Sequence, residues 1–73
     1  MDNIVRNKFA QRLKELRLES GLTRQQPADQ LNVSVRLLSY WENGQRECNF
    51  DTLLMLSKIL DSTIDYLLGN TEN

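Results

Sequence analysis

Residues 21–46, GLTRQQPADQLNVSVRLLSYWENGQR, are the part of the sequence that decides the fold. Thr23, followed three residues later by Gln26, makes a capping-box pattern, which predicts the start of a helix. Ala28 is a small residue on the inward side of this helix. Asn32 can end the helix, because asparagine tolerates the left-handed backbone conformation that is common just after helices. The stretch therefore opens with one short helix.

A second short helix follows almost at once. Ser34 is a favoured N-cap residue, and it precedes a helix predicted over residues 35–43, which the pair Asn43-Gly44 ends. Only the turn at residues 32–34 separates the two helices. Such a pair forms a helix-turn-helix, in which the second helix can lie in the major groove of DNA while the first crosses the phosphate backbone.

The second helix has two faces of different chemistry. At about 100° per residue, the outward face spans about 140°, and it comprises Val35, Arg36, Ser39 and Tyr40. Leu38 and Trp41 lie on the opposite side, with Glu42 at the edge. We expect the bulky apolar pair to face the core, which leaves the other face to solvent or to a ligand.

Apolar stripes predict three further helices around this motif. The helix before it places on one face Val5, Phe9, Leu13 and Leu16, and it ends at Gly21. The helix after it is capped by Asn49 and directs inward Phe50, Leu53, Leu54 and Leu60. A last short turn runs from the cap Thr63 to Gly69. Five short helices with brief connections and no strand pattern predict a compact all-α domain over residues 1–73.

Composition excludes several classes of function. The chain has 73 residues, one cysteine (Cys48) and no histidine, so it cannot form an internal disulfide and has no histidine for a metal site or a catalytic base. No stretch approaches the roughly 18 apolar residues of a membrane-spanning helix, and the amino terminus does not read as a signal peptide. We therefore expect a soluble intracellular domain that is not an enzyme and has no metal, cofactor, membrane or small-molecule substrate.

The charge is unevenly distributed along the chain. The net charge of −1 counts against a strong nucleic-acid binder, since a basic face is the usual footprint of such a protein. Residues 1–46, however, carry eight Lys or Arg against five acids, a net +3, whereas residues 47–73 carry one against five, a net −4. This polarity leaves room for a DNA-facing amino-terminal part.

The sequence resembles the Cro/C1-type (Xre) family of helix-turn-helix transcriptional regulators. The resemblance covers about residues 9–70. It rests on four motifs at matching spacings: Gly21-Leu22-Thr23, Val33-Ser34, Trp41-Glu42-Asn43-Gly44 and Asp65-Tyr66-Leu67-Leu68-Gly69. It implies the five-helix fold of the lambda-repressor DNA-binding domain, with the helix-turn-helix at about residues 23–43.

The resemblance also implies roles for individual residues. The positions that would read bases are Val35, Arg36, Ser39 and Tyr40, where Arg36 would donate paired hydrogen bonds to guanine and Val35 would touch a thymine methyl group. The positions that would hold phosphates are Thr23, Arg24, Ser34, Arg46 and Asn49. Arg17 and Glu42 match a family pair, which we expect to be a structural ion pair because a buried charge needs a partner.

The chain departs from the family pattern at several positions. Pro27 stands where a core leucine is usual and cannot donate a helical hydrogen bond, so we expect the helix to start late or with a distorted turn. Cys48 replaces a common proline, and Asp61 and Ser62 replace a usual glycine and valine. Five side chains could form a surface for a protein partner instead of DNA, namely Val35, Leu37, Tyr40, Met55 and Ile59.

Two hypotheses for function follow. The first is a sequence-specific regulator, phage-repressor-like or Cro-like, that binds a double-stranded DNA operator as a homodimer in the cytoplasm of a bacterium, associated with its nucleoid, whether encoded by the bacterium or by a phage. The second is an antirepressor or lysogeny modulator that binds a repressor protein through the same fold. An antitoxin role is a further alternative. The operator, the sign of regulation and the oligomeric state are left open.

Overall fold

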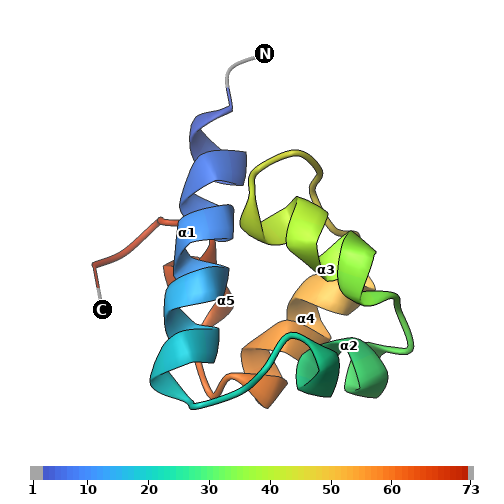
Figure 1. Ribbon diagram of the computed structural model, residues 1–73. Helices are drawn as coiled ribbons and strands as arrows, with labels where there is room; N and C mark the ends of the chain where they lie inside the picture. The colour runs from blue at the N-terminus through green and yellow to red at the C-terminus, as the bar shows by residue number, and fades with distance from the viewer. Residues whose placement is uncertain (1–2, 73) are drawn as a thin grey trace.

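The computed structural model describes residues 3–72 and contains five helices (Figure 1). They are α1 (Ile4–Glu19), α2 (Gln25–Leu31), α3 (Val35–Glu42), α4 (Phe50–Ile59) and α5 (Ile64–Leu67). No strand occurs within this range, which confirms the predicted all-α class. None of the helices between residues 3 and 72 is long and apolar enough to span a membrane. The predicted domain also includes residues 1, 2 and 73, which lie outside the described residues.

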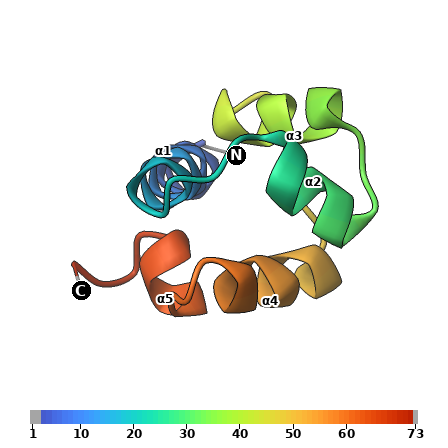
Figure 2. The ribbon, with the colours of Figure 1, turned by 60° about the horizontal axis from the view of Figure 1, so that its bottom comes forward.

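The helices surround one small core. α1 packs against α3 and α5, and α2 packs against α3 and α4. Figure 2 shows α3 and α4 on opposite sides of the domain, with α1 at one end. The side chains buried between them are mostly leucines, and the fully buried ones include Leu13, Leu38, Leu56 and Leu67. α3 is therefore supported from inside while its other side faces outward.

Three of the predicted helix caps are confirmed. The Ser34 hydroxyl oxygen accepts a hydrogen bond from the Leu37 amide at 3.0 Å at the start of α3. The Asn49 side chain does the same for the Thr52 amide at 2.8 Å, and Thr63 caps α5. Each cap satisfies an amide that has no partner within its own helix. These local bonds fix where α3, α4 and α5 begin.

The start of α2 differs from the predicted cap. The helix begins at Gln25, and Thr23 is not its N-cap. Only half of the capping box forms, with the Gln26 side-chain oxygen accepting from the Thr23 amide at 2.8 Å. The first helical hydrogen bond joins the Ala28 amide to the Arg24 carbonyl at 3.2 Å. Pro27 thus lies in the first turn, where no amide is needed, which confirms the expected late start.

Three residues predicted to face the core are exposed instead. Val5 is 56% exposed, Leu54 is 46% exposed and Phe50 is 89% exposed. Along α4, apolar side chains cover more than one face, and the stripe that packs inward is Leu53, Leu56 and Leu60. Val5 lies in the first turns of α1, which stand at the top of the domain in Figure 1, next to the amino terminus.

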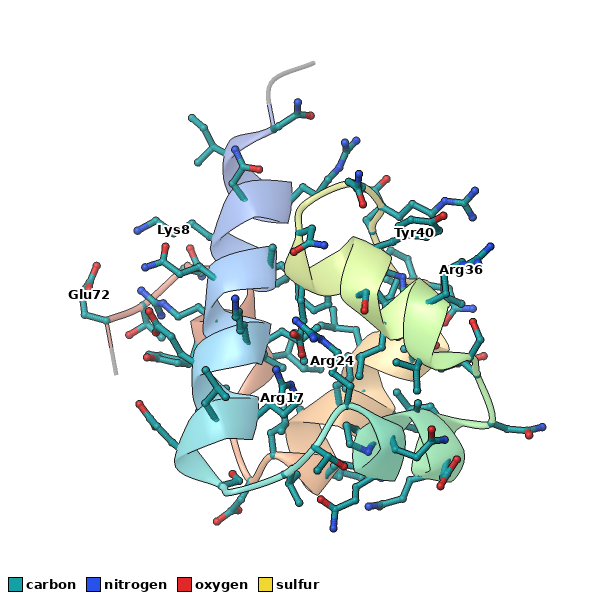
Figure 3. All side chains as sticks on the ribbon, viewed as in Figure 1. Lys8, Arg17, Arg24, Arg36, Tyr40 and Glu72 are labelled. Atoms are coloured by element: carbon teal, nitrogen blue, oxygen red, sulfur yellow. The ribbon has the colours of Figure 1, made fainter. Side chains whose placement is uncertain are left out.

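A buried arginine holds the carboxyl-terminal segment against α1, and no local pattern predicts it. Arg12 is only 6% exposed. Its guanidinium group donates to the carbonyls of Tyr66 at 3.0 Å and Thr71 at 3.1 Å, and it lies 4.0 Å from the centre of the Tyr66 ring. A longer contact of 3.7 Å joins it to Glu72, visible beside α1 in Figure 3. Arg12 is thus a structural cation and is not available to a ligand.

Candidate nucleic-acid interface

The inner face of α3 anchors this helix in the core. Leu38 is fully buried, Trp41 is 3% exposed and Glu42 is 5% exposed. The predicted orientation of Leu38 and Trp41 is confirmed. Because these side chains lie on one side of an eight-residue helix, the opposite side is held in a fixed position toward solvent.

A buried cluster of charges ties α3 to two other segments. Arg17 on α1 contacts Glu42 through two hydrogen bonds, of 2.6 Å and 3.1 Å, and also donates to the Leu22 carbonyl at 2.9 Å. Arg24 reaches the same carboxylate at 3.1 Å from the start of α2 (Figure 3). Paired hydrogen bonds between a guanidinium and a carboxylate fix orientation as well as distance. The cluster therefore sets the position of α3 relative to α1 and α2.

Arg24 has a role that the sequence did not reveal. We expected it on a phosphate, but in the structure its guanidinium is bonded to Glu42. Its side chain is still 37% exposed. The Glu42 carboxylate faces two guanidinium groups, so the cluster carries a net positive charge that it shares with the surface at the start of α2.

The outer face of α3 presents polar and cationic groups. Figure 3 shows Arg36 and Tyr40 on the same side of the domain, pointing away from α1. Arg36 is exposed, and Ser39 and Tyr40 are half-buried. Arg46, in the loop after α3, has its guanidinium 5.4 Å from the centre of the Tyr40 ring. The structure thus brings Arg36, Tyr40 and Arg46 together on one surface.

The predicted phosphate ligands do not form one continuous set. Both the Thr23 amide and its hydroxyl contact the Gln26 side chain, at 2.8 Å and 3.4 Å. Ser34 accepts its capping bond through oxygen and keeps its hydroxyl proton to donate. Asn49 lies at the start of α4, on the wall of an apolar pocket. Of these residues, Ser34 is the one at the start of α3 itself.

The side chains expected to attract a protein partner are divided between two sides of the domain. Val35, Leu37 and Ile59 are half-buried and pack against the core. Met55 is 44% exposed, but it lies on α4, across the domain from α3 (Figure 2). The five residues therefore do not form one apolar surface.

Cys48 has the properties of a packed thiol. Burial raises its pKa from 9.0 to about 11, with a smaller contribution from the neighbouring Glu47 charge. The thiolate is the nucleophilic form of cysteine, so the raised pKa keeps Cys48 mostly in the thiol form near neutral pH.

Comparisons with known proteins agree with the fold and the motif. The sequence model of the helix-turn-helix family matches residues 13–67. The chain is 42% identical over 64 residues to the HTH-type transcriptional regulator ImmR of Bacillus subtilis, a match that covers 88% of this chain and 50% of ImmR. The chain spans about half the length of the curated relatives it matches.

Two solved structures are similar throughout the domain. The restriction-modification controller protein C.AhdI from Aeromonas hydrophila has a TM-score of 0.76 and 32% identity, covering 85% of this chain and 94% of that chain. A transcriptional regulator from Listeria innocua has a TM-score of 0.80 and 32% identity, covering 89% of this chain and 61% of that chain. The likeness thus extends over both helices of the motif and the helices that support them.

Proposed function

This chain belongs to the helix-turn-helix family of Cro/C1 type, and from that premise we propose that it is a sequence-specific DNA-binding transcriptional regulator. It acts as a homodimer on a roughly palindromic operator, with half-sites about one helical turn apart. It is a regulator rather than an enzyme, it needs no cofactor, and it works on DNA in the cytoplasm of a bacterium. The observation that carries the proposal is the outer face of α3, where Arg36, Tyr40 and Arg46 gather on a helix that the core holds rigidly.

The side chains on this face have distinct roles in the proposal. Arg36 enters the major groove and donates two hydrogen bonds to a guanine. Val35 and Ser39 lie next to it and contact base edges, and Tyr40 contacts a base or a phosphate. Arg46 and the Ser34 hydroxyl bind phosphates and set the position of α3 on the duplex.

The charges in the structure limit how strongly salt affects binding. Three of the eight cations within residues 1–46 are engaged inside the protein, namely Arg12, Arg17 and Arg24. On the outer face of α3, Arg36 and Arg46 form no ion pair with any described residue. Because Arg36 is assigned to a base, a dimer would neutralise two phosphates through its two Arg46 side chains. Each neutralised phosphate adds about 0.9 to the salt dependence, so the slope of log K against log salt should be about −2.

Selection from a random duplex library at low salt, followed by titration at several salt concentrations, tests the proposal. We expect a palindrome to be enriched and the affinity for it to fall with the slope given above. No enrichment with well-folded protein would contradict direct DNA recognition.

Arg36→Ala tests the proposal that α3, here called the reading helix, contacts the bases. Loss of a paired contact to guanine should cost about 1–3 kcal/mol of operator affinity and relax specificity at one base pair. Lys8→Ala is the matched control, because Lys8 is an exposed cation on the side of α1 that faces away from α3 (Figure 3). If the two variants bind the operator with equal affinity, Arg36 does not contact a base.

The alternative role as an antirepressor gains no support. The proteins similar to this chain are named transcriptional regulators. The apolar side chains that suggested a partner surface pack largely against the core.

A further inference from the structure

An open apolar pocket of about 470 Å³ lies between the first turns of α1 and the start of α4. Val5 and Phe9 line it from α1, and Phe50 and Leu53 line it from α4. The loop between α3 and α4 forms a further wall. The pocket and the reading helix are therefore connected through a single short loop.

Phe50 stands beside this pocket with its ring in water. It is 89% exposed, the highest value among the exposed large hydrophobic side chains of residues 3–72. As the first residue of α4 it follows the Asn49 cap, so its backbone is fixed. A solvent-exposed phenyl ring on a fixed backbone next to an apolar concavity is a feature that favours association.

The same pocket carries one charge of each sign. Arg6 and Glu47 both line it. The Arg6 Nε atom is buried and has no hydrogen-bond partner among the described residues. Glu47 is exposed. An isologous interface under a twofold rotation needs a self-complementary face, and a cation and an anion beside a protrusion and a hollow supply the elements of one.

We propose that a second copy of the chain docks on this face about a twofold axis, with Phe50 of each copy in the pocket of the other. Arg6 of each copy then faces Glu47 of its partner copy. An apolar cavity of about 150 Å³ holds a benzene ring, so this pocket has room for a phenyl ring and its surroundings. This inference rests on the proposed function, because it assigns the interface of the proposed homodimer.

The position of this interface, next to the loop after α3, suits binding to two half-sites of an operator. The loop that carries Glu47 follows α3 directly, so a contact through this loop fixes the separation of the two reading helices.

The interface is small. A buried aromatic side chain contributes about 150–250 Å². Two rings and the walls that receive them fall below the roughly 1,200–2,000 Å² of stable interfaces. The dimer therefore dissociates on dilution, and binding to two adjacent half-sites completes its assembly.

Sedimentation equilibrium of the full chain tests the interface without DNA. We expect a reversible monomer–dimer equilibrium, and Phe50→Ala should raise its Kd on the order of tenfold or more. Leu54→Ala is the matched control: Leu54 lies one turn further along α4, is 46% exposed and does not line the pocket, so its Kd should stay within about twofold of the wild type. Circular dichroism should show both variants folded, since neither side chain is in the core. A Phe50→Ala dimer as tight as the wild type would overturn the proposal.

Charge reversal gives a second, independent test. Arg6→Glu and Glu47→Arg should each weaken the dimer, and the double variant should restore most of the affinity, because the pair is reversed and not removed. A double variant weaker than both single variants would show that the two side chains do not face each other.

A third measurement separates this inference from the proposed function. On a duplex with one half-site of the selected operator, Phe50→Ala should bind as the wild type does, whereas on the full operator it should lose cooperativity. If the protein forms dimers that depend on Phe50 but binds no DNA, the interface is supported and the proposed function is contradicted. If the wild type is strictly monomeric and its pocket binds 1-anilinonaphthalene-8-sulfonate, the pocket does not receive a second copy of the chain. Its occupant would then be an apolar ligand.

Discussion

The two faces of α3 differ in what their side chains contact: the inner face packs into the domain, and the outer face carries the residues of the proposed DNA contact. On the inner face, Leu38 and Trp41 are buried and Glu42 pairs with two arginines. On the outer face, Arg36 is exposed, and the Tyr40 ring lies 5.4 Å from the Arg46 guanidinium. The inner face thus fixes the helix, whereas Arg36 on the outer face can be replaced at little cost in folding.

This difference makes the two properties separable in experiments. Substitutions on the inner face should lower the free energy of unfolding and affect DNA binding through loss of folded protein or a displaced α3, without removing a contact to DNA. Substitutions of exposed residues on the outer face should lower the affinity for DNA and leave the free energy of unfolding nearly unchanged. Variants that affect both properties equally would break the comparison.

Glu42→Gln should have the largest effect. It leaves Arg17, which is 6% exposed, without a compensating charge in the core. Removal of one partner of a buried ion pair costs about 3–5 kcal/mol, a large share of the stability of a domain of this size. Urea unfolding followed by circular dichroism measures the change.

Glu19→Gln provides the control for that substitution. Glu19 is an exposed acid at the end of α1, and its replacement should change the free energy of unfolding by less than about 0.5 kcal/mol. If Glu42→Gln costs no more than this control, the charge cluster does not hold α3 in place.

Ser34, the N-cap of α3, and Ser39, on its outer face, give a pair of substitutions with a medium effect. Ser34→Ala removes the cap that bonds the Leu37 amide, which should cost about 1 kcal/mol of stability. Ser39→Ala lies on the outer face and should leave stability within about 0.5 kcal/mol while weakening operator binding. Thermal unfolding and operator titration of both variants are the measurements. A Ser39→Ala variant less stable than Ser34→Ala would show that the outer face contributes to folding.

Local patterns predicted most of this arrangement. The caps Ser34, Asn49 and Thr63 depend on atoms three residues away, so a short stretch of sequence contains the whole interaction. The inner and outer faces of α3 follow from helical periodicity in the same way. The outer face of α3 was therefore predictable except for the packing of Val35 against the core and the contact between Tyr40 and Arg46, because no periodic pattern determines the conformation of that loop.

Features that depend on distant segments were not predictable. Several faces of α4 carry apolar residues, and only the packing of other helices decides that Leu56 is buried while Phe50 is exposed. Arg12 bonds a carbonyl 59 positions further along the chain. Arg24 bonds Glu42, 18 positions away, and so it is partly withdrawn from the surface where the sequence placed it.

Tyr40→Phe should have the smallest effect, and it tests how the outer face works. The variant keeps the ring beside Arg46 and removes only the hydroxyl group. A net hydrogen bond is worth about 0.5–1.5 kcal/mol, so operator affinity should fall by that amount while the free energy of unfolding stays within about 0.5 kcal/mol. Tyr40→Ala also removes the ring, and an exposed cation–π contact adds about 0.5–1 kcal/mol. Operator titrations should therefore give a lower affinity for Tyr40→Ala than for Tyr40→Phe. If the two variants bind equally, the ring does not position Arg46, and the outer face acts through separate side chains; if Tyr40→Phe binds as the wild type does, the hydroxyl group contacts neither base nor phosphate.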